Sequence, residues 1–299
     1  MYKINEGYIE KAISTFYSLI ADKGDGAPDT RYRSWEWCYM AFREEKEKYR
    51  EANEEEQAKI VDYLALHLAF YLASWGMYRG SSYLLQRDYK THIKTAKLLL
   101  NSEYDSLWGY TPTEEALNNE RSNAAELIFN NESGLYKKIK DSYKDYDGAN
   151  EDDASDTLVT KILMGTLGCV PAFDRFLKRG IKWLNKQCAN SITCKIENGR
   201  NYGKTFGELE KLAVANKEAL SLTANGLEYP IMKCVDMFLW QIGYELDMAD
   251  ELRKELKEVK KARLIKAASK MGICDQNDIA ETVVEKITGR WHLPSDITE

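Results

Sequence analysis

The sequence predicts an all-α fold, a globular multi-helix array with room for one short β-hairpin. Apolar residues recur at the three- and four-residue spacing of amphipathic helices along most of the 299 residues. The one segment that we expect to form a β-hairpin is short. Hydrophobic residues make up 44% of the chain and aromatic residues 11%, which is enough for a sizeable core. We expect one domain over residues 1–299, with a division into two lobes, about 1–140 and 141–299, left open.

Helical periodicity runs through the first half of the chain. The second half of residues 54–77 is apolar on all sides, so we expect it to be central. Residues 113–129 begin with Thr113 and two acids, which is typical of a helix N-terminus. The helices expected in this half are residues 4–21, 34–51, 54–77, 87–100 and 113–129, with a loop at 22–30.

The second half contains the expected hairpin and a long helix. Asn198 and Gly199 have the chemistry of a two-residue turn, which indicates a hairpin over residues 195–204. Residues 141–156 are acidic and contain glycine, so we expect a loop there. The helices expected in this half are residues 157–168, 172–190, 206–219, 230–268 and 278–289, the fourth broken near 247–250.

Charge and hydropathy exclude several classes of protein. A net charge of −6 excludes a uniformly basic nucleic-acid binder. The start of the chain lacks the basic region and apolar run of a secretory signal. The most apolar stretch, residues 63–78, is shorter than the roughly 20 residues that a membrane span needs. We therefore expect a cytoplasmic protein with no membrane partner.

The cysteines and histidines do not form a metal-binding pattern. No two of the 6 cysteines have CxxC spacing, and none of the 3 histidines lies near a cysteine. No dinucleotide-binding, P-loop or metalloprotease motif is present. We expect reduced thiols, no metal and no cofactor. The cysteines are Cys38, Cys169, Cys188, Cys194, Cys234 and Cys274.

Charge is distributed unevenly along the chain. Residues 103–156 carry 14 acids against 5 bases, whereas residues 175–204 carry 8 bases against Glu197 alone. A locally basic segment can bind a phosphate backbone even in an acidic protein, and the alternative is a solvated helix face. A second basic segment covers residues 253–270. The candidate DNA-binding residues are Arg175, Lys178, Arg179, Lys182, Lys186, Lys195, Arg200 and Lys204.

The turn between two predicted helices carries the candidate catalytic residue. After residues 157–168 come Val170 and Pro171, and Asp174 follows at the start of the next helix. A carboxylate there meets unpaired backbone N–H groups and the positive end of the helix dipole. It is suited to stabilising a developing cation or orienting water. The alternative role for Asp174 is a purely structural cap or ion pair.

The stretch Val-Pro-Ala-Phe-Asp, residues 170–174, resembles the Val-Pro-x-Asp turn of helix-hairpin-helix DNA glycosylases, whose aspartate is catalytic. The resemblance implies that Asp174 offsets the cationic sugar formed when a flipped nucleotide loses its base. Bifunctional members of this family place a nucleophilic lysine in the hairpin helix. Residues 153–157 contain no lysine, so the resemblance implies a monofunctional enzyme.

Two further segments have the residue types of a pocket for a base. Residues 74–89 are dense in Trp, Tyr, Arg, Gln and Ser, which stack planar groups and bond their edges. Lys233, Asp236 and Trp240 share one face of a predicted helix, at i, i+3 and i+7. The alternatives are an aromatic core and a helix ion pair. The candidate substrate-binding residues are Trp75, Tyr78, Arg79, Ser82, Gln86, Arg87, Lys233, Asp236 and Trp240.

Three hypotheses about function follow. The first is a monofunctional DNA glycosylase that excises a modified base, with DNA as its partner. Residues 75–82, Trp-Gly-Met-Tyr-Arg-Gly-Ser-Ser, are similar to a segment of uncharacterised bacterial proteins, which implies a role in antiphage defence. The second is a ribonuclease similar to the all-α HEPN family, whose Arg-x4-His signature matches Arg87 and His92. The third is a non-enzymatic helical module that binds nucleic acid or protein. The sequence indicates no obligate protein partner.

Overall fold

The computed structural model describes residues 4–21, 31–80, 82–118, 121–144, 154–187, 192 and 202–291. Within these residues the all-α prediction is confirmed, and the described β structure is one two-stranded antiparallel sheet. The helices of the first half are α1 (Glu6–Ala21), α2 (Ser34–Glu51), α3 (Glu54–Ser74), α4 (Ile93–Leu99), α5 (Glu114–Leu117), α6 (Asn123–Phe129) and α7 (Leu135–Lys144). Those of the second half are α8 (Asp156–Thr166), α9 (Arg175–Gln187), α10 (Tyr202–Ala215), α11 (Ile231–Leu252), α12 (Glu258–Lys270) and α13 (Ala280–Arg290). Short 3-10 helices are η1 (Arg31–Arg33), η2 (Tyr89–His92) and η3 (Ser102–Leu107).

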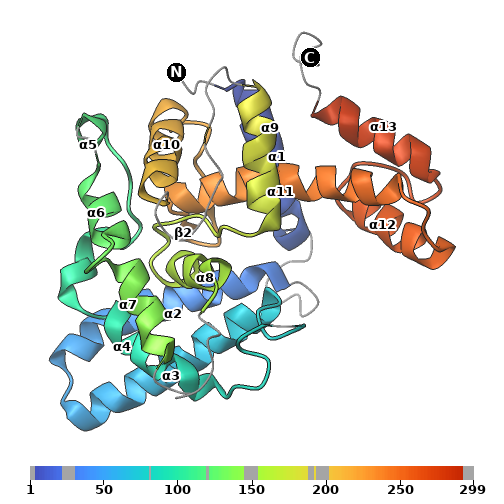
Figure 1. The fold of residues 1–299 in the computed structure, drawn as a ribbon. Helices are drawn as coiled ribbons and strands as arrows, with labels where there is room; N and C mark the ends of the chain where they lie inside the picture. Colours follow the sequence, from blue (N-terminus) through green and yellow to red (C-terminus); the bar gives the residue numbers. More distant parts are fainter. Residues whose placement is uncertain are drawn as a thin grey trace.

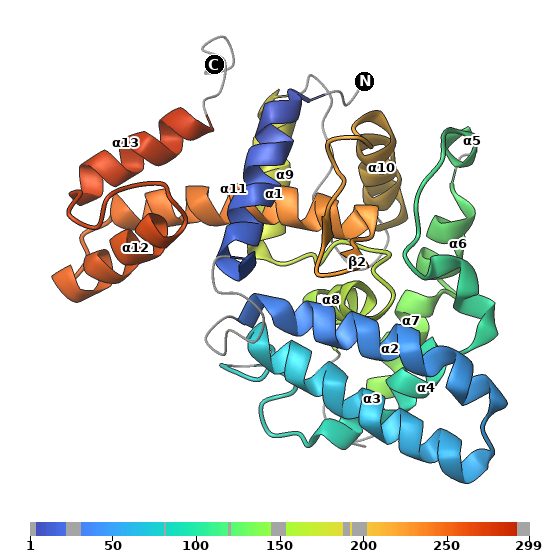
Figure 2. The same ribbon diagram turned by 180° about the vertical axis from the view of Figure 1, so that it is seen from behind.

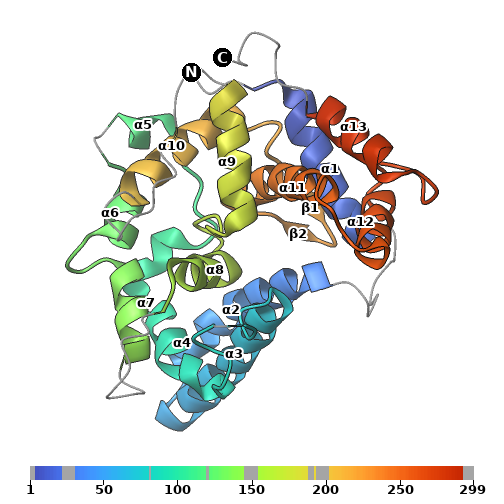
Figure 3. The same ribbon diagram turned by 45° about the vertical axis from the view of Figure 1, so that its right-hand side comes forward.

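The helix α11 runs through the middle of the molecule, with α9 in front of it (Figure 1). Seen from behind, α1 crosses the other side of α11 (Figure 2). The view nearly along α11 shows α9 and α1 on opposite sides of it (Figure 3). Every residue from Ile231 to Gly243 is buried, because this stretch is apolar apart from Lys233, Asp236 and Gln241. The central helix therefore brings charged side chains into the core.

Two glycines let α9 and α11 pack backbone against backbone. A side-chain carbon added at Gly180 would lie 2.0 Å from the carbonyl oxygen of Leu239. One added at Gly243 would lie 1.9 Å from the carbonyl oxygen of Phe176. Such contacts are far below van der Waals distance, so only glycine fits at either position. The start of α9, and with it Asp174, is thereby fixed against the middle of α11.

One continuous core joins elements that are far apart in the sequence. The buried cluster extends from Ile4 to Trp291. The N-terminal helix α1 packs on α11, and α2 packs on both α3 and α8. The two halves of the chain therefore share a single core.

Two of the predicted boundaries in the first half are wrong. The single helix predicted over residues 113–129 forms α5 and α6, because Thr113 and Ser122 each cap a separate helix start. The loop predicted over residues 141–156 begins inside α7, whose buried stripe extends to Tyr143. In both places, side-chain contacts override the local composition.

The long helix predicted over residues 230–268 is interrupted after Leu252, several residues later than expected. Asp247 and Asp250 do not end α11, because they pair with Arg175 and Arg179 of α9.

Of the hairpin predicted over residues 195–204, residues 195–201 lie outside the described residues, and residues 202–204 form the start of α10 instead of a strand. The described hairpin joins β1 (Thr223–Ala224) to β2 (Leu227–Glu228) through Asn225 and Gly226. These two residues have φ angles of 53° and 73°, as a two-residue type I′ turn requires. The Asn-Gly pair is the sequence signal for this turn, which leads directly into α11.

The helix α3 is buried on one face only, so the prediction that its second half is enclosed on all sides is wrong. Tyr63, Leu66 and Phe70 are 47%, 53% and 58% exposed. They share one side of the helix at i, i+3 and i+7. Among the described residues, no helix combines the length and the apolar character that crossing a membrane requires.

Candidate active site

Asp174 lies immediately before the first residue of α9, where the sequence predicts it. Its Oδ1 accepts hydrogen bonds from the backbone N–H groups of Phe176 and Leu177, at 2.9 and 3.0 Å. The turn before it is held by Thr160 of α8, whose Oγ1 accepts from the N–H of Phe173 at 3.0 Å. Asp174 therefore caps α9, and the positive end of the helix dipole faces its carboxylate.

The second carboxylate oxygen of Asp174 accepts hydrogen bonds from two side chains. Lys161 Nζ and Trp240 Nε1 each lie 3.2 Å from Oδ2. The side chain of Lys161 is 5% exposed, and that of Asp174 is 14% exposed. With two backbone donors on Oδ1 and two side-chain donors on Oδ2, the lone-pair positions of the carboxylate are filled. Asp174 is therefore arranged to act through its charge rather than by abstracting a proton.

A second buried ion pair holds the same turn. Lys233 Nζ lies 2.9 Å from Asp236 Oδ2, and the two side chains are 4% and 6% exposed. The other oxygen of Asp236 accepts from the backbone N–H of Ala172 at 2.9 Å. Ala172 precedes Asp174 by two residues, so this bond fixes the backbone that carries the candidate catalytic group. Asp236 is in this sense a positioning residue.

Aromatic rings surround both ammonium groups. Lys233 Nζ lies over the rings of Phe16, Trp35 and Trp75, at 5.1, 5.3 and 5.8 Å from their centroids. Lys161 Nζ lies 5.1 Å from the centroid of the Trp75 ring. Cation–π contacts of this kind offset part of the cost of removing an ammonium group from water. Trp75 contacts both ammonium groups and so links the two ion pairs.

Partly exposed rings lead from this cluster to the surface. Trp240 stacks on Tyr244 with centroids 4.9 Å apart and meets Phe176 edge-on at 5.2 Å. Tyr32 meets Trp75 edge-on at 5.4 Å. All of these except Trp240 are partly exposed. Flat apolar surfaces beside a charged group are suited to stacking a planar ligand such as a nucleobase.

Five residues that the sequence singled out in separate segments meet in one place. Lys161 was not predicted, although it is the only charged residue in the segment 157–168, and a lone charge in an apolar helix indicates a buried partner. Phe16 and Tyr32 carry no such local signal, because they reach the site through tertiary packing. The residues that meet are Trp75, Asp174, Lys233, Asp236 and Trp240.

The loop that follows α3 is organised around its own contacts. Ser82 Oγ donates a hydrogen bond to the carbonyl oxygen of Met77. The guanidinium group of Arg87 lies 4.1 Å from the centroid of the Tyr83 ring. Two further candidates from this loop are exposed, Arg79 and Gln86.

His92 is fully buried between two phenol groups. Its Nε2 lies 2.7 Å from Tyr78 Oη, and its Nδ1 lies 2.7 Å from Tyr143 Oη. Burial lowers the pKa of His92 to about 3 and raises the pKa of Tyr78 to about 12. An acid–base catalyst needs a pKa near the working pH and contact with the substrate. The surroundings of His92 therefore favour a role in the core over the ribonuclease hypothesis.

We expect His92→Gln to weaken the dependence of stability on acid pH. The unfolded chain protonates His92 near the ordinary pKa of 6.5, whereas the folded chain resists protonation down to about 3. Stability is therefore lost as the pH falls below 6.5. Between about pH 7 and about pH 5 this group should account for about 2 kcal/mol. Urea unfolding of both proteins at the two pH values measures the difference, and equal losses would contradict the prediction.

The basic run predicted to bind DNA is partly neutralised by α11. Arg175 pairs with Asp247 at 3.4 Å, and Arg179 pairs with Asp250. The acids that pair with these two arginines thus come from another part of the chain, because residues 175–204 contain almost none. Three lysines of α9 form no ion pair with another described residue, Lys178, Lys182 and Lys186. The candidates whose side chains lie outside the described part are Lys195, Arg200 and Lys204.

A cavity of about 720 Å³ lies between α2, the hairpin and the start of α11. Two smaller cavities, of about 580 and 430 Å³, lie beside α4 and between α11 and α13. Asp174 lines none of these three. The charged residues that line the cavity of about 720 Å³ have both signs, Arg43, Lys46, Lys217, Glu47 and Glu228.

Within the described residues, no three His, Cys, Asp or Glu side chains gather as a metal site requires. Comparisons of the chain with protein-family models, with curated proteins and with solved structures found no match. The link to the glycosylases therefore consists of the turn before α9 and the groups around it.

Proposed function

We propose that this protein is a monofunctional DNA glycosylase that excises a modified base from duplex DNA. The supporting observation is the cluster at the turn that carries Asp174: its own ion pair with Lys161, the pair Lys233–Asp236 that holds the turn, and several aromatic rings, from helices far apart in the sequence. Buried ion pairs add little net stability, and clusters of ionisable groups in unusual surroundings occur preferentially at functional sites. The resemblance of residues 170–174 to the glycosylase turn points to the same residue.

The chemistry requires a charge rather than a base at Asp174. The bond between C1′ of the sugar and the base nitrogen breaks, and its electron pair leaves with the base. The sugar becomes cationic, and the carboxylate of Asp174 stabilises it without forming a covalent bond. Water then adds its oxygen to C1′, and the proton that it gives up ends on the base nitrogen. The products are a free base and an abasic site.

Duplex DNA must present the base out of the stack, which costs a few kcal/mol of unstacking and unpairing. Stacking on aromatic side chains returns about 1–3 kcal/mol per base. The partly exposed rings of Trp75, Phe176 and Tyr244 supply such surfaces next to Asp174. Lys178, Lys182 and Lys186 of α9, which form no ion pair with another described residue, would contact the phosphates beside the flipped nucleotide. We propose phage DNA with modified bases as the substrate and antiphage defence as the role.

The test is a search for released base. The protein is incubated with phage DNA that carries modified bases and with the same sequence unmodified, and small molecules are analysed by mass spectrometry. We expect free modified base, and strand breaks only after treatment with an abasic-site nuclease. Breaks without the nuclease would contradict the monofunctional assignment. DNA binding without base release would support the non-enzymatic module instead.

A further inference from the structure

The helix α12 and the residues just before it form an exposed basic segment. Residues 253–270 contain 8 bases, Arg253, Lys254, Lys257, Lys260, Lys261, Arg263, Lys266 and Lys270, against Glu255 and Glu258. The only fully buried residue of α12 is Ala268. The helix packs on the end of α11 and on α13, and the pair projects to one side of the molecule (Figure 1). Its length is thus open to a partner.

Several of these bases have no acidic partner. Lys254 and Lys260 share Glu251, and Lys261 pairs with Glu258. By contrast, Arg263, Lys266 and Lys270 form no ion pair with another described residue, and all three are exposed. Their spacing of i, i+3 and i+7 places them on one face of the helix. Within the described residues this stripe resembles Lys178, Lys182 and Lys186 of α9, whereas the two arginines of α9 are paired with acids of α11.

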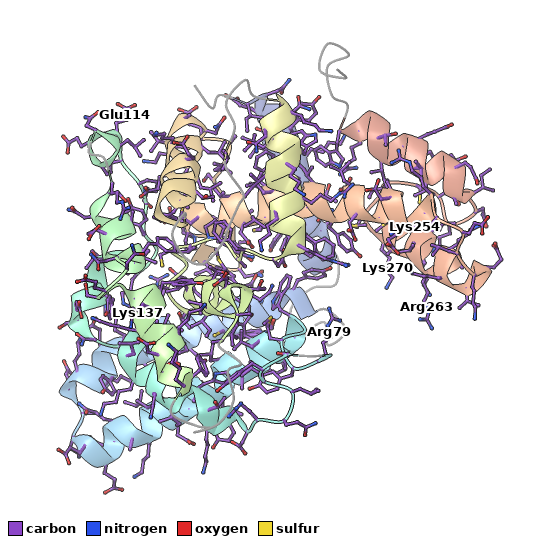
Figure 4. All side chains as sticks on the ribbon, in the orientation of Figure 1. Arg79, Glu114, Lys137, Lys254, Arg263 and Lys270 are labelled. Carbon is purple, nitrogen blue, oxygen red and sulfur yellow. The ribbon has the colours of Figure 1, made fainter. Side chains whose placement is uncertain are left out.

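One face of α11 runs from the contact with Asp174 to the contact with α12. Trp240, Tyr244, Asp247 and Glu251 recur every three or four residues and share one face of α11. Trp240 donates to Asp174, Asp247 pairs with Arg175 of α9, and Glu251 pairs with Lys260 of α12. One face of α11 therefore connects the candidate active site to α12. Figure 4 shows Arg263 and Lys270 at the lower edge of α12.

We propose that the stripe Arg263, Lys266 and Lys270 binds the phosphate backbone of duplex DNA at a distance from the extruded base. The end of α11 lies about 18 Å from Trp240, for 12 residues at about 1.5 Å each. One strand has a phosphate about every 3.4 Å along the duplex, so this distance corresponds to about five base pairs. The position relative to the base rests on the proposed function, whereas binding of a polyanion does not.

An anionic membrane surface is the other polyanion that a basic helix meets. A helix that lies on a membrane buries an apolar face among the lipids. On α12 the partly buried Leu264 and Ile265 pack against the protein core. Val259, which is 68% exposed, is the one large apolar side chain that α12 presents to solvent. The composition of the exposed face therefore favours nucleic acid.

The first experiment measures the affinity of the full chain for an unmodified duplex as a function of salt. The variant carries Arg263→Gln, Lys266→Gln and Lys270→Gln. Each lost phosphate contact lowers the slope of log affinity against log salt by about 0.9, so we expect a decrease of about 2.7. Over a fourfold rise in salt, wild type should then lose about 40-fold more affinity than the variant.

The matched control removes three lysines, each of which already pairs with an acid on its own helix. Lys48, Lys59 and Lys137 are exposed and pair with Glu45, Glu55 and Asp141. Replacing all three by Gln changes net charge equally and should leave the slope within about 0.5 of wild type. An unchanged slope in the α12 variant, or the same change in the control, overturns the proposal. Binding to phosphatidylserine vesicles but not to DNA also overturns it.

A second experiment tests the position of the contact. Duplexes with one modified base are extended base pair by base pair on either side. We expect affinity to rise when one flank becomes long enough to reach the stripe, in wild type and not in the α12 variant. If the slope changes as expected but no base is ever released, the proposed function fails and the α12 contact stands. If base is released but the slope and flank length have no effect, only the α12 contact fails.

Discussion

Asp174→Asn is expected to lower the rate of base release by about 100- to 1000-fold, the usual effect of removing one group that stabilises transition-state charge. Asparagine is as good a helix cap as aspartate, so the bonds from Phe176 and Leu177 remain. The change removes the negative charge that would face the cationic sugar. Single-turnover release of a modified base from a saturated complex measures the effect without a contribution from DNA affinity.

The matched control is Asp141→Asn. Asp141 lies on α7 and pairs with two exposed lysines, Lys137 and Lys144. Figure 4 places Lys137 on the opposite flank of the molecule from α12. We expect Asp141→Asn to release base at the wild-type rate. Equal rates for the two variants would show that Asp174 only caps α9, and the proposed mechanism would then be wrong.

A loss of activity in Asp174→Asn has a structural alternative, because Lys161 also loses its ionic partner. The double variant Lys161→Met, Asp174→Asn removes the unpaired charge as well. If the single variant is inactive only because Lys161 is displaced, the double variant should recover release. If the charge of Asp174 stabilises the transition state, the double variant stays inactive. Circular dichroism and urea unfolding should show that all of these variants are folded.

The sequence predicts where a residue lies along a helix better than it predicts which side chains that residue contacts. Asp174 could be placed at a helix start because the Pro-containing turn and the following basic helix are local features. Its ion pair with Lys161 could not be assigned, because it depends on how α8 returns against α9. The same limit applies to residues 175–204, which are nearly free of acids in sequence yet meet Asp247 and Asp250 in the fold. A run of like charges in the sequence therefore does not predict which of its members pair with acids elsewhere in the fold.

Some of the predicted helix boundaries are wrong for a related reason. The helix periodicity of residues 34–51 matches α2 residue for residue, because its apolar stripe and its ends agree. The segment 113–129 has similar periodicity, but the cap at Ser122 creates a second helix start. The turn at Asn225 and Gly226 has the same dipeptide as the hairpin predicted over residues 195–204. A hairpin at this position could therefore have been predicted from the sequence by the same rule. Pairing of such short strands depends on the helix α11 that follows them.

The largest expected effect on stability comes from the ion pair beneath the turn that carries Asp174. Lys233→Met leaves the carboxylate of Asp236 buried, and Asp236→Asn leaves the ammonium group of Lys233 among aromatic rings. Removing one partner of a buried pair typically costs about 3–5 kcal/mol, whereas replacing both groups is often close to neutral. We therefore expect each single variant to lose about 3–5 kcal/mol of unfolding free energy, and the double variant to lose less than either.

Urea unfolding of the four proteins gives the coupling energy, which we expect to exceed about 2 kcal/mol. The exposed pair Lys59 and Glu55 on α3 is the control cycle, with an expected coupling below about 0.5 kcal/mol. Additive losses at Lys233 and Asp236 would contradict the account of this pair as a buried, mutually compensating unit.

In Asp236→Asn the amide oxygen still accepts a hydrogen bond from the backbone N–H of Ala172, so the turn stays attached to α11. The rate of base release by Asp236→Asn, measured at a temperature where this variant is folded, therefore separates two effects of Asp236. One is the effect of its charge, and the other is its effect on the position of Asp174. A wild-type rate there means that Asp236 contributes position alone.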